Sequence, residues 1–569
     1  MRRILLLVAM VCCGFVLRAQ VANYGQVSGA FQMDAQYYGD DAGLGIDAEY
    51  LKGKRLGFNG FGKVNYSLGN FSAGIRYEAF LTPLSGFDAR SQGVGLANAW
   101  ASFDNGTIGV TIGDFYEQFG SGLVLRSYEE WTLGYDNALK GMRVVYRPAA
   151  GVTLKGVVGS QRFFWEDYNK NKGIVRGVDA EWDLSQTFTK MNDSDFSATI
   201  GASAVSKYQP DNNPIYVFPE NVAAFAGRAN LRYGRFALET EYAYKINDPS
   251  YINNYIYTHG EALLATLSYS QKGLGLVLQV KRTNNMSFKS DRTADGSVLD
   301  INFIPPFNRV HTYSLSALYP YATQPNGEMA MQFQANYKIP KGTPLGGRYG
   351  TSFAFNFSQV NDIVRNYVEG VTSMQDANGT LGYTSPFFGV SDHKFFRDIN
   401  VTFDKKFSKK WKMQAEYVNL YYDIATIEGH PGLEPVKANI GVVDVSWSFA
   451  KKQTLRLELQ HLWDAMDTDV VIPEEEQNNF KKAGNWMSAM LEYTLAPKWF
   501  VAVGDKYNYG NPIPEFRQHY YSVSAGYIKD ATRITVTAGR QNEGMLCVGG
   551  VCRLVPASSG VSLSVTTSF

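Results

Sequence analysis

The fold class is decided by the last stretch of the chain, Val561-Ser562-Leu563-Ser564-Val565-Thr566-Thr567-Ser568-Phe569. Its apolar residues occupy alternate positions, and small hydroxyl residues fill the positions between them. A period of two places the apolar side chains on one face of a β-strand and the hydroxyls on the other. A regular strand that ends on an aromatic residue is typical of a barrel whose last strand pairs with its first. We therefore expect residues 23–38 to pair with residues 560–569 in a closed sheet.

The amino terminus has the features of an export signal. Two arginines precede an apolar run over residues 4–16, and Ala19 offers a cleavage site. This pattern is typical of a secretory signal peptide, and the run is too short to span a membrane. A lipoprotein signal at Cys12-Cys13 is the alternative, but bulky residues precede the pair where lipid attachment requires small ones. We predict a signal peptide over residues 1–19 and one mature domain over residues 20–569.

The composition favours a barrel over a helical membrane protein. Aromatic residues make up 14% of the chain and there are 55 glycines, which suits strands, tight turns and aromatic girdles. Beyond the signal, no stretch of about 18 apolar residues could form a transmembrane helix. The mean hydropathy of −0.22 is expected for a barrel, because only alternate strand residues meet lipid. The 54 basic and 53 acidic residues nearly balance, so we predict no nucleic-acid partner.

The alternation of the last strand recurs along the chain. Further alternating segments lie at residues 71–81, 107–112, 455–460, 521–527 and 534–538. Charged residues within these segments share one face, which should meet water, so the apolar face should point outward to lipid. A soluble β-sandwich with wet outer faces is the alternative. The export signal and the terminal strand favour the barrel.

The connections between these segments alternate between short and long. Short turns are expected at residues 69–70, 105–106, 234, 272–275, 408–410, 451–452, 497–498 and 529–530, and long segments at 38–53, 82–95, 115–139, 286–328, 360–395, 465–483 and 542–556. Short and long connections alternate throughout only if Arg309 to Leu318 is part of a long external loop and not a strand. We predict an all-β fold, a single closed antiparallel transmembrane β-barrel of about 24 strands (22–26) with short periplasmic turns and long extracellular loops.

Three motifs stand out: GDFYEQFGSGL at residues 113–123, LGGRYGT at 345–351 and CVGGVCR at 547–553. With the signal and the terminal strand, they resemble an uncharacterised family of Bacteroidota outer-membrane barrels. The resemblance extends over essentially the whole mature chain and implies the fold and a location in the cell outer membrane. Such a protein would have outer-membrane lipid and the barrel-assembly machinery as partners. The family has no established activity, so no functional residue is carried over from it.

Cys547 and Cys552 flank Gly549-Gly550, which can form the two-residue turn of a hairpin, where positive φ is needed. The cysteines would form the second cross-strand pair, with a Cα separation of roughly 4.5 Å that a disulfide tolerates. Export to an oxidising compartment favours the disulfide. A metal site is the rival interpretation, but two thiolates without a nearby His or further Cys are a poor ligand set. We expect a disulfide, no metal and no cofactor.

The segment 115–139 is the best candidate for a functional loop. A wide barrel leaves a lumen that a loop of this length can narrow, and opposed charges at a constriction set ion and solute selectivity. The candidate constriction residues are Arg126, Glu129, Glu130 and Asp136. Alternatively, these charges pair with strand-borne charges such as Arg76 or Glu78 and only anchor the loop. Residues 305–328 are a second inward candidate, whose aromatic side chains could stack on sugars or pack against the wall.

Catalysis finds little support. The six histidines are scattered and no Gly-x-Ser-x-Gly motif occurs, so we do not expect an enzyme. Two classes remain: a porin-like channel or transporter for small hydrophilic solutes, and a non-conducting structural, assembly or secretion-partner barrel whose loops bind another protein. A TonB-dependent receptor is disfavoured, because strand-like sequence starts at about Asn23, where such receptors carry a plug domain. An open lumen would favour the first class, and a lumen filled by loops the second.

Phe569 is expected to be the signal read during barrel assembly and an anchor at the membrane interface. Phe569→Ser, or deletion of the last few residues, should therefore reduce insertion into the outer membrane far more than an equally conservative change in mid-chain. The amount of heat-modifiable protein in the outer-membrane fraction measures this. Normal insertion of the Phe569 variant would show that the residue is not the signal.

Overall fold

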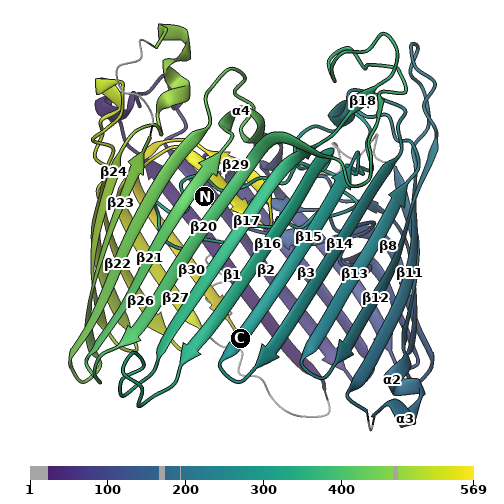
Figure 1. The fold of residues 1–569 in the computed structure, drawn as a ribbon, viewed down its shortest axis with the longest axis horizontal. Coiled ribbons are helices and arrows are strands. Elements are labelled where there is room, and N and C mark those ends of the chain that lie inside the picture. The colour runs from purple at the N-terminus through teal and green to yellow at the C-terminus, as the bar shows by residue number, and fades with distance from the viewer. Residues whose placement is uncertain (1–23, 166–172, 193, 466–471) are drawn as a thin grey trace.

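The computed structural model describes residues 24–165, 173–192, 194–465 and 472–569. The predicted signal peptide, residues 1–19, lies outside these residues. In the described part, 24 antiparallel strands form one sheet that closes on itself (Figure 1). The barrel strands are β1 (Gln26–Tyr38), β2 (Leu56–Leu68), β3 (Phe71–Thr82), β4 (Gly93–Asp104), β5 (Ile108–Phe115), β8 (Leu139–Ala149), β9 (Val152–Gln161), β10 (Ile174–Asp183), β11 (Phe196–Tyr208), β12 (Asn221–Tyr233), β13 (Phe236–Lys245), β14 (Gly260–Gln271), β15 (Leu274–Asn284), β16 (Gly327–Ile339), β17 (Thr351–Ile363), β20 (Val390–Lys406), β21 (Trp411–Tyr422), β22 (Val436–Ala450), β23 (Gln453–Asp464), β24 (Trp486–Leu495), β25 (Trp499–Tyr507), β26 (Ser522–Lys529), β27 (Thr532–Gln541) and β30 (Ser558–Ser568).

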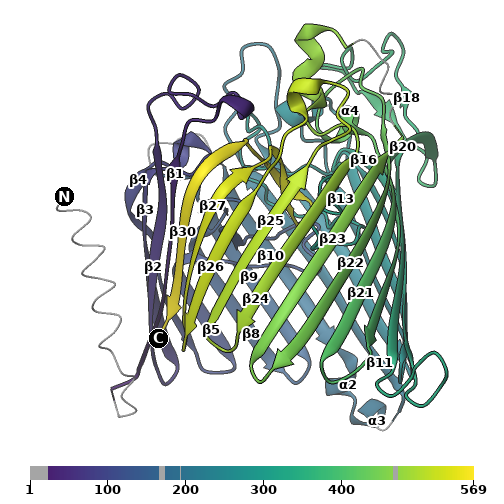
Figure 2. The same cartoon turned by 90° about the vertical axis from the view of Figure 1, so that its left-hand side faces the viewer.

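The barrel closes between its first and last strands, as predicted. β1 pairs with β30 in a register that runs from Ala30 opposite Ser568 to Tyr38 opposite Gly560 (Figure 2). Beyond the strand, the Gly29 N–H donates to the Phe569 carbonyl and the Phe569 N–H donates to the Gly29 carbonyl, both at 3.0 Å. The closed sheet therefore leaves no free edge.

The outer surface is apolar and the inner surface carries the charges. On β3, Ile75 is 51% exposed and the next residue, Arg76, is 3% exposed. On β23, Leu457 and Leu459 are exposed on the outside, while Glu458 between them is buried. Every backbone group of a closed barrel is paired within the sheet, so this arrangement is that of a barrel that spans a membrane. Within the described residues, no helix is long and apolar enough to cross a membrane.

Short turns and long loops lie at opposite ends of the barrel (Figure 1); we call these the turn end and the loop end. At the loop end, three short hairpins form within long loops: β6 (Glu129–Glu130) with β7 (Tyr135–Asp136), β18 (Asn366–Tyr367) with β19 (Tyr383–Thr384), and β28 (Gly544–Val548) with β29 (Val551–Val555). Short helices complete the described fold: α2 (Leu184–Thr187) and α3 (Thr189–Asn192) at the turn end and α4 (Ile424–Ile427) at the loop end.

The excursion between β15 and β16, residues 285–326, is not external. Arg309 to Leu318 forms no strand, as predicted, but it lies against the inner wall. Arg309 donates to Asn400 of β20 at 2.6 Å, and the Tyr313 hydroxyl donates to Asp444 of β22 at 3.2 Å. The physical reason is that this loop carries too many apolar side chains to remain in water, and the lumen is the space that can bury them.

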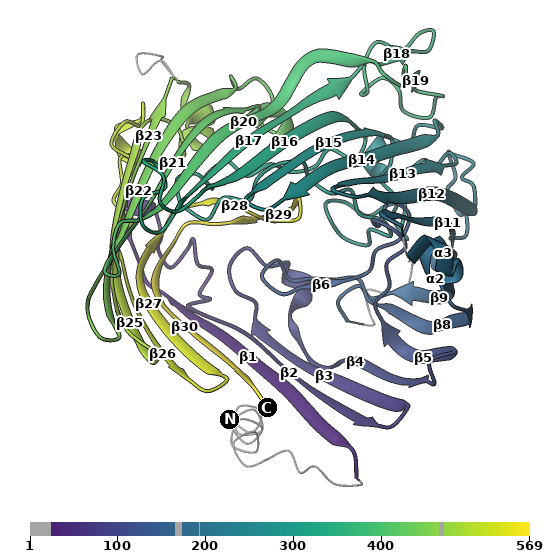
Figure 3. The same cartoon turned by 60° about the horizontal axis from the view of Figure 1, so that its bottom comes forward.

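The lumen contains a hydrophobic core to which strands from β5 to β24 contribute. Between β10 and β14, its inward-pointing strand residues include Val175, Val205, Val222, Ala224, Ala243 and Ala262. Phe119, Leu123 and Leu125 of the loop 116–138 belong to the same buried cluster, as do Met286 and Phe288 of the loop 285–326. The inner surface that was expected to face water is therefore covered by loops along these strands. Figure 3 shows β6 and the β28–β29 hairpin inside the ring of strands.

The hairpin of β28 and β29 has the predicted register and contains the Cys547–Cys552 disulfide, with the two Cα atoms 4.1 Å apart. Gly549 and Gly550 have φ of 58° and 79°, which is the two-residue turn that requires positive φ at both positions. The tip of the hairpin contacts the loop 285–326, because the Thr323 N–H donates to the Gly550 carbonyl at 3.3 Å.

Candidate functional site

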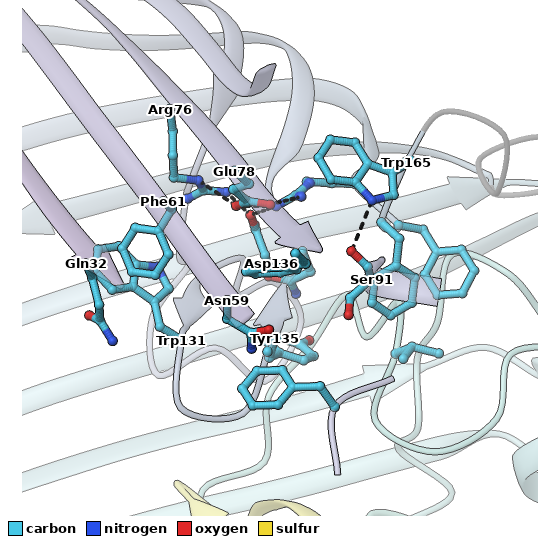
Figure 4. A pocket seen from close by; sticks show the side chains of 18 of the residues that line it. Gln32, Asn59, Phe61, Arg76, Glu78, Ser91, Trp131, Tyr135, Asp136 and Trp165 are labelled. Carbon is cyan, nitrogen blue, oxygen red and sulfur yellow. Dashed lines mark hydrogen bonds and ion pairs between the residues drawn. The ribbon is translucent and has the colours of Figure 1, made fainter. Parts of the chain in front are cut away.

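The loop 116–138 is held against the barrel wall by a buried group of ion pairs around Arg76 (Figure 4). Arg76 points inward from β3, where its Nε lies 2.9 Å from Glu78 of the same strand. Its guanidinium also pairs with Glu129 and Asp136, which the short strands β6 and β7 place side by side. The strand period explains the geometry, since residues two apart on β3 share the inner face.

Two further cations complete the group. Arg162, directly after β9, pairs with Glu78 at 2.6 Å and also with Asp136. Lys63 of β2 lies opposite Arg76 in the sheet and pairs with Glu129 at 2.7 Å. Three cations thus face three carboxylates, so the group is neutral overall. A buried set of this kind is tolerated because every member has an opposite charge beside it.

Two ionisable groups of the loop respond to this environment. Burial alone would raise the pKa of Asp136, but Arg162 and Arg76 outweigh it and hold that pKa below its usual value. The Tyr116 hydroxyl donates to Asp136 at 3.0 Å. Burial, reinforced by the nearby Asp136 carboxylate, raises the pKa of Tyr116. Asp136 is thus an ionised anchor and Tyr116 a neutral donor.

The four candidate constriction residues do not converge on one point. Glu129 and Asp136 both pair with Arg76. This is the alternative in which these charges anchor the loop to the wall. Arg126 instead lies over the rings of Tyr128 and Phe303, at 4.6 and 4.0 Å from their centroids. Glu130 accepts from the Thr132 hydroxyl at 2.6 Å. A role of these residues in selectivity stays a prediction.

Sequence reasoning did not identify Lys63, Arg162 or Tyr116 as part of this group. The position of Lys63 could have been found, because β2 and β3 form a hairpin in which it is the direct neighbour of Arg76. Arg162 and Tyr116 lie just after the ends of β9 and β5. Outside a strand, the period of two no longer predicts whether a side chain points inward or outward. Their partners depend on how the loop folds back.

A cavity of about 80 Å³ lies beside the ion pairs, and its lining combines aromatic rings with polar and charged side chains (Figure 4). Its aromatic lining comes from β2, β3 and three loops at the loop end: Phe61, Phe80, Phe87, Trp131, Tyr135, Phe163, Phe164 and Trp165. Asn59 of β2 lines the cavity and is 4% exposed. Its Oδ1 accepts from the Leu84 N–H at 3.1 Å, while its Nδ2 has no hydrogen-bond partner in the described part of the chain.

The second inward loop, 285–326, is anchored by His311. One ring nitrogen lies 2.7 Å from Asp398 of β20 and the other lies 3.2 Å from Glu416 of β21. Both nitrogens must donate to satisfy two carboxylates, so the ring is protonated. Burial would lower the pKa of His311, but the two carboxylates outweigh it and raise this pKa to about 9. Over the residues that the structure describes, no group of three or more His, Cys, Asp or Glu residues could hold a metal ion.

Similar solved structures are outer-membrane barrels with little sequence identity. The siderophore receptor PirA of Pseudomonas aeruginosa has 8% identity, with 95% of this chain and 80% of that chain covered and a TM-score of 0.41. The P pilus tip assembly intermediate PapC-PapD-PapK-PapG of E. coli has 10% identity, with 97% of this chain and 62% of that chain covered and a TM-score of 0.46. The outer membrane protein opdK of Pseudomonas aeruginosa has 11% identity, 77% and 96% coverage and a TM-score of 0.35. These likenesses concern the fold alone.

No curated protein matches the chain. The sequence model of one protein family does match it, over residues 1–569, and that family is described as a family of unknown function, DUF6029.

Arg76→Ala should release the loop 116–138 and destabilise the barrel. The variant leaves Glu78, Glu129 and Asp136 short of a cation, and the loss of one partner from a buried ion pair costs about 3–5 kcal/mol. The matched control is Arg147→Ala, which removes a half-exposed pair with Asp104 at 3.2 Å and should cost about 0–1 kcal/mol. The temperature at which the folded band disappears on gels compares the two. Equal effects would show that the ion pairs do not anchor the loop.

The anchor at His311 should weaken in alkali. Its pKa is higher in the folded protein than the ordinary 6.5, so its contribution is fully present below that value and is lost as the pH rises through about 9. His311→Gln should therefore lower the free energy of unfolding by up to about 3 kcal/mol at about pH 6 and by little at about pH 10. The unfolding temperature measured at the two pH values compares these effects.

The control for the alkaline experiment is His393→Gln, because His393 is half exposed and pairs with Asp423 at 2.8 Å. A pair of that kind contributes about 0–1 kcal/mol. A cost of His311→Gln that does not change with pH would contradict the charged anchor.

Proposed function

Since this chain belongs to the DUF6029 family of unknown function, we propose its function from its geometry: it is an outer-membrane channel for small hydrophilic solutes, narrowed by loops that fold into its lumen. The single observation that carries this proposal is an asymmetry of the inner wall. On the side of β10 to β13, the inward residues are buried under the loops. On the side of β26, β27 and β30 they remain partly exposed.

The exposed side is lined by small hydroxyl groups. They are Ser522 and Ser524 of β26, Thr535 and Thr537 of β27, and Ser562, Ser564 and Thr566 of β30. Their apolar neighbours on the same strands, such as Val523 and Val536, are exposed on the outside of the barrel. A wall of hydroxyls that carries few charges can hydrogen-bond water and neutral solutes without selecting one ionic sign. We call it the hydroxyl wall.

The inward loops narrow the lumen and are stiff. The loop 116–138 is anchored by the ion pairs of Arg76, and the loop 285–326 by His311. The hairpin that carries the disulfide meets the loop 285–326 at Gly550 and Thr323. Because the ion-pair anchors are buried, the constriction they form should be permanent rather than gated by a mobile loop.

A second candidate function is the alternative from the sequence, a barrel whose loops bind another protein. Two observations favour it. The loops 116–138 and 285–326 fill part of the lumen, which is the condition given above for this class, and the loop end carries strongly exposed apolar residues, Ile215, Val217, Leu381 and Phe388, at 68–84% exposure. They belong to the loops 209–220 and 364–389. Scattered apolar residues of this kind are common on protein surfaces, and the hydroxyl wall has no role in this alternative.

Planar-bilayer recordings with the purified protein test the channel. Ser564 faces Asp34 of β1 and Thr535 of β27 across the sheet, so Ser564→Trp should place an indole in the passage and reduce single-channel conductance severalfold. The matched control is Leu563→Trp, one residue away on the outward face, which should conduct like the wild type. Removal of residues 117–137 should raise conductance.

The recordings also separate the two candidate functions. If the wild type does not conduct and removal of the loop opens no current, the channel proposal fails and the partner-binding barrel is the better account. If Leu563→Trp reduces conductance as much as Ser564→Trp, the passage does not follow the hydroxyl wall.

A further inference from the structure

The aromatic cavity beside Arg76 has the features of a ligand site that the channel function alone does not require. It opens between the inner faces of β1 to β3 and the loop 116–138, and Gln32 and Asp34 of β1 form part of its lining. Asp34 lies opposite Ser564 of the hydroxyl wall. The cavity therefore borders the proposed passage from the side.

The rings that line the cavity are held in fixed positions. Trp131 packs edge-on against Phe61, with the ring centroids 3.7 Å apart, and Lys63 Nζ lies over the indole, 4.4 Å from its centroid. The Trp165 indole N–H donates to the Ser91 carbonyl at 3.1 Å. Trp165 also packs against the backbone of Gly93, where any side chain would overlap its ring. Rings that are fixed before a ligand arrives lose little entropy when it binds.

Asn59 supplies a hydrogen-bond donor that has no use within the described residues. Its amide orientation is set by the Leu84 N–H, which donates to Oδ1, so Nδ2 is free to point into the cavity. A buried donor without a partner costs about 1–3 kcal/mol. Such a group at the surface of a cavity indicates an acceptor that arrives from outside the chain.

The charges around the cavity restrict what the ligand can be. Within the described residues, the two cations of the lining, Arg76 and Arg162, are both paired with carboxylates, as is Lys63 beside them, which disfavours an anionic ligand. Asp34 adds a single carboxylate, which accepts from Gln32 at 2.7 Å. A neutral ligand with several hydroxyls suits this lining, because it can donate to carboxylates and accept from amides.

We infer that this cavity binds the ring of a neutral sugar, with one apolar C–H face against the aromatic rings and its hydroxyls toward Asn59, Gln32 and Asp34. The volume of about 80 Å³ holds roughly five to eight water-sized positions, which is the space of one ring and not of an oligosaccharide. Where the proposed channel function holds, this inference names the class of its solute. Binding itself requires no conduction.

Calorimetric titration of the full-length protein in detergent tests the inference. The probes are methyl β-D-glucopyranoside and methyl β-D-galactopyranoside, with citrate and L-arginine as charged compounds of similar size. We expect binding of at least one glycoside and of neither charged compound. Preference for a charged compound, or no heat with either glycoside up to the highest soluble concentration, would overturn the inference.

Variants locate the binding site. Trp131→Ala and Asn59→Leu should each weaken glycoside binding about tenfold or more, which corresponds to a loss of about 1.4 kcal/mol. The matched control is Trp447→Ala, which removes an outward ring that stacks on Trp411 and should bind like the wild type. Heat-modifiability on gels confirms that each variant folds.

The outcomes separate this inference from the proposed function. If Trp131→Ala fails to fold, the milder Trp131→Phe and the partly exposed Gln32→Ala are titrated instead, and unchanged affinity in both would overturn the site. Glycoside binding by a protein that does not conduct would leave the site intact and end the channel proposal. Conduction without glycoside binding would overturn the sugar site and leave the channel proposal intact.

Discussion

The backbone hydrogen bonds of a sheet in hydrocarbon must all be made within the sheet, and the rest of this structure depends on that constraint. An unpaired N–H or C=O in lipid costs several kcal/mol, so a strand edge cannot be left open. The pairing of β1 with β30 meets this requirement, down to the reciprocal bonds between Gly29 and Phe569. Closure with 24 strands then fixes a second condition: the space inside is too wide for the wall side chains alone to fill.

The chain meets the second condition with its own loops, and the chemistry inside the barrel reflects what they bring. Apolar loop residues such as Phe119 and Phe288 pack on an apolar part of the wall. Charged loop residues meet charged wall residues, and the group around Arg76 is neutral because an unpaired buried charge would be too costly. The two proposals concern the parts of the interior where this filling stops, which are the hydroxyl wall and the aromatic cavity.

Much of the barrel could be predicted from the sequence, because a period of two specifies a strand and its faces. Residues 561–569 predicted both the last strand and the closure, and Gly549-Gly550 predicted the hairpin register. The destination of the loops could not be predicted, since it depends on contacts such as Arg309 with Asn400, far apart in the chain. One signal was available: residues 222–226 are apolar on both faces of β12, and a strand that avoids water on both sides is covered on both sides. For the candidate site, the alternative in which loop charges pair with Arg76 or Glu78 is met by Arg76, whereas Glu78 pairs with Arg76 and Arg162 instead. Trp131 and Asn59 carry no pattern that marks a cavity.

The connection between Thr323 and Gly550 has a consequence for the order of events in time. The loop 285–326 is synthesised before β20 to β23, yet its anchors Asp398, Glu416 and Asp444 lie on those strands. The hairpin that meets this loop lies between β27 and β30, the last two strands of the barrel. The contents of the lumen therefore cannot reach their final arrangement before the wall is nearly complete. An unfinished barrel of this protein must carry its largest apolar loop without the surface that covers it, and the last hairpin arrives together with the strand that seals the wall.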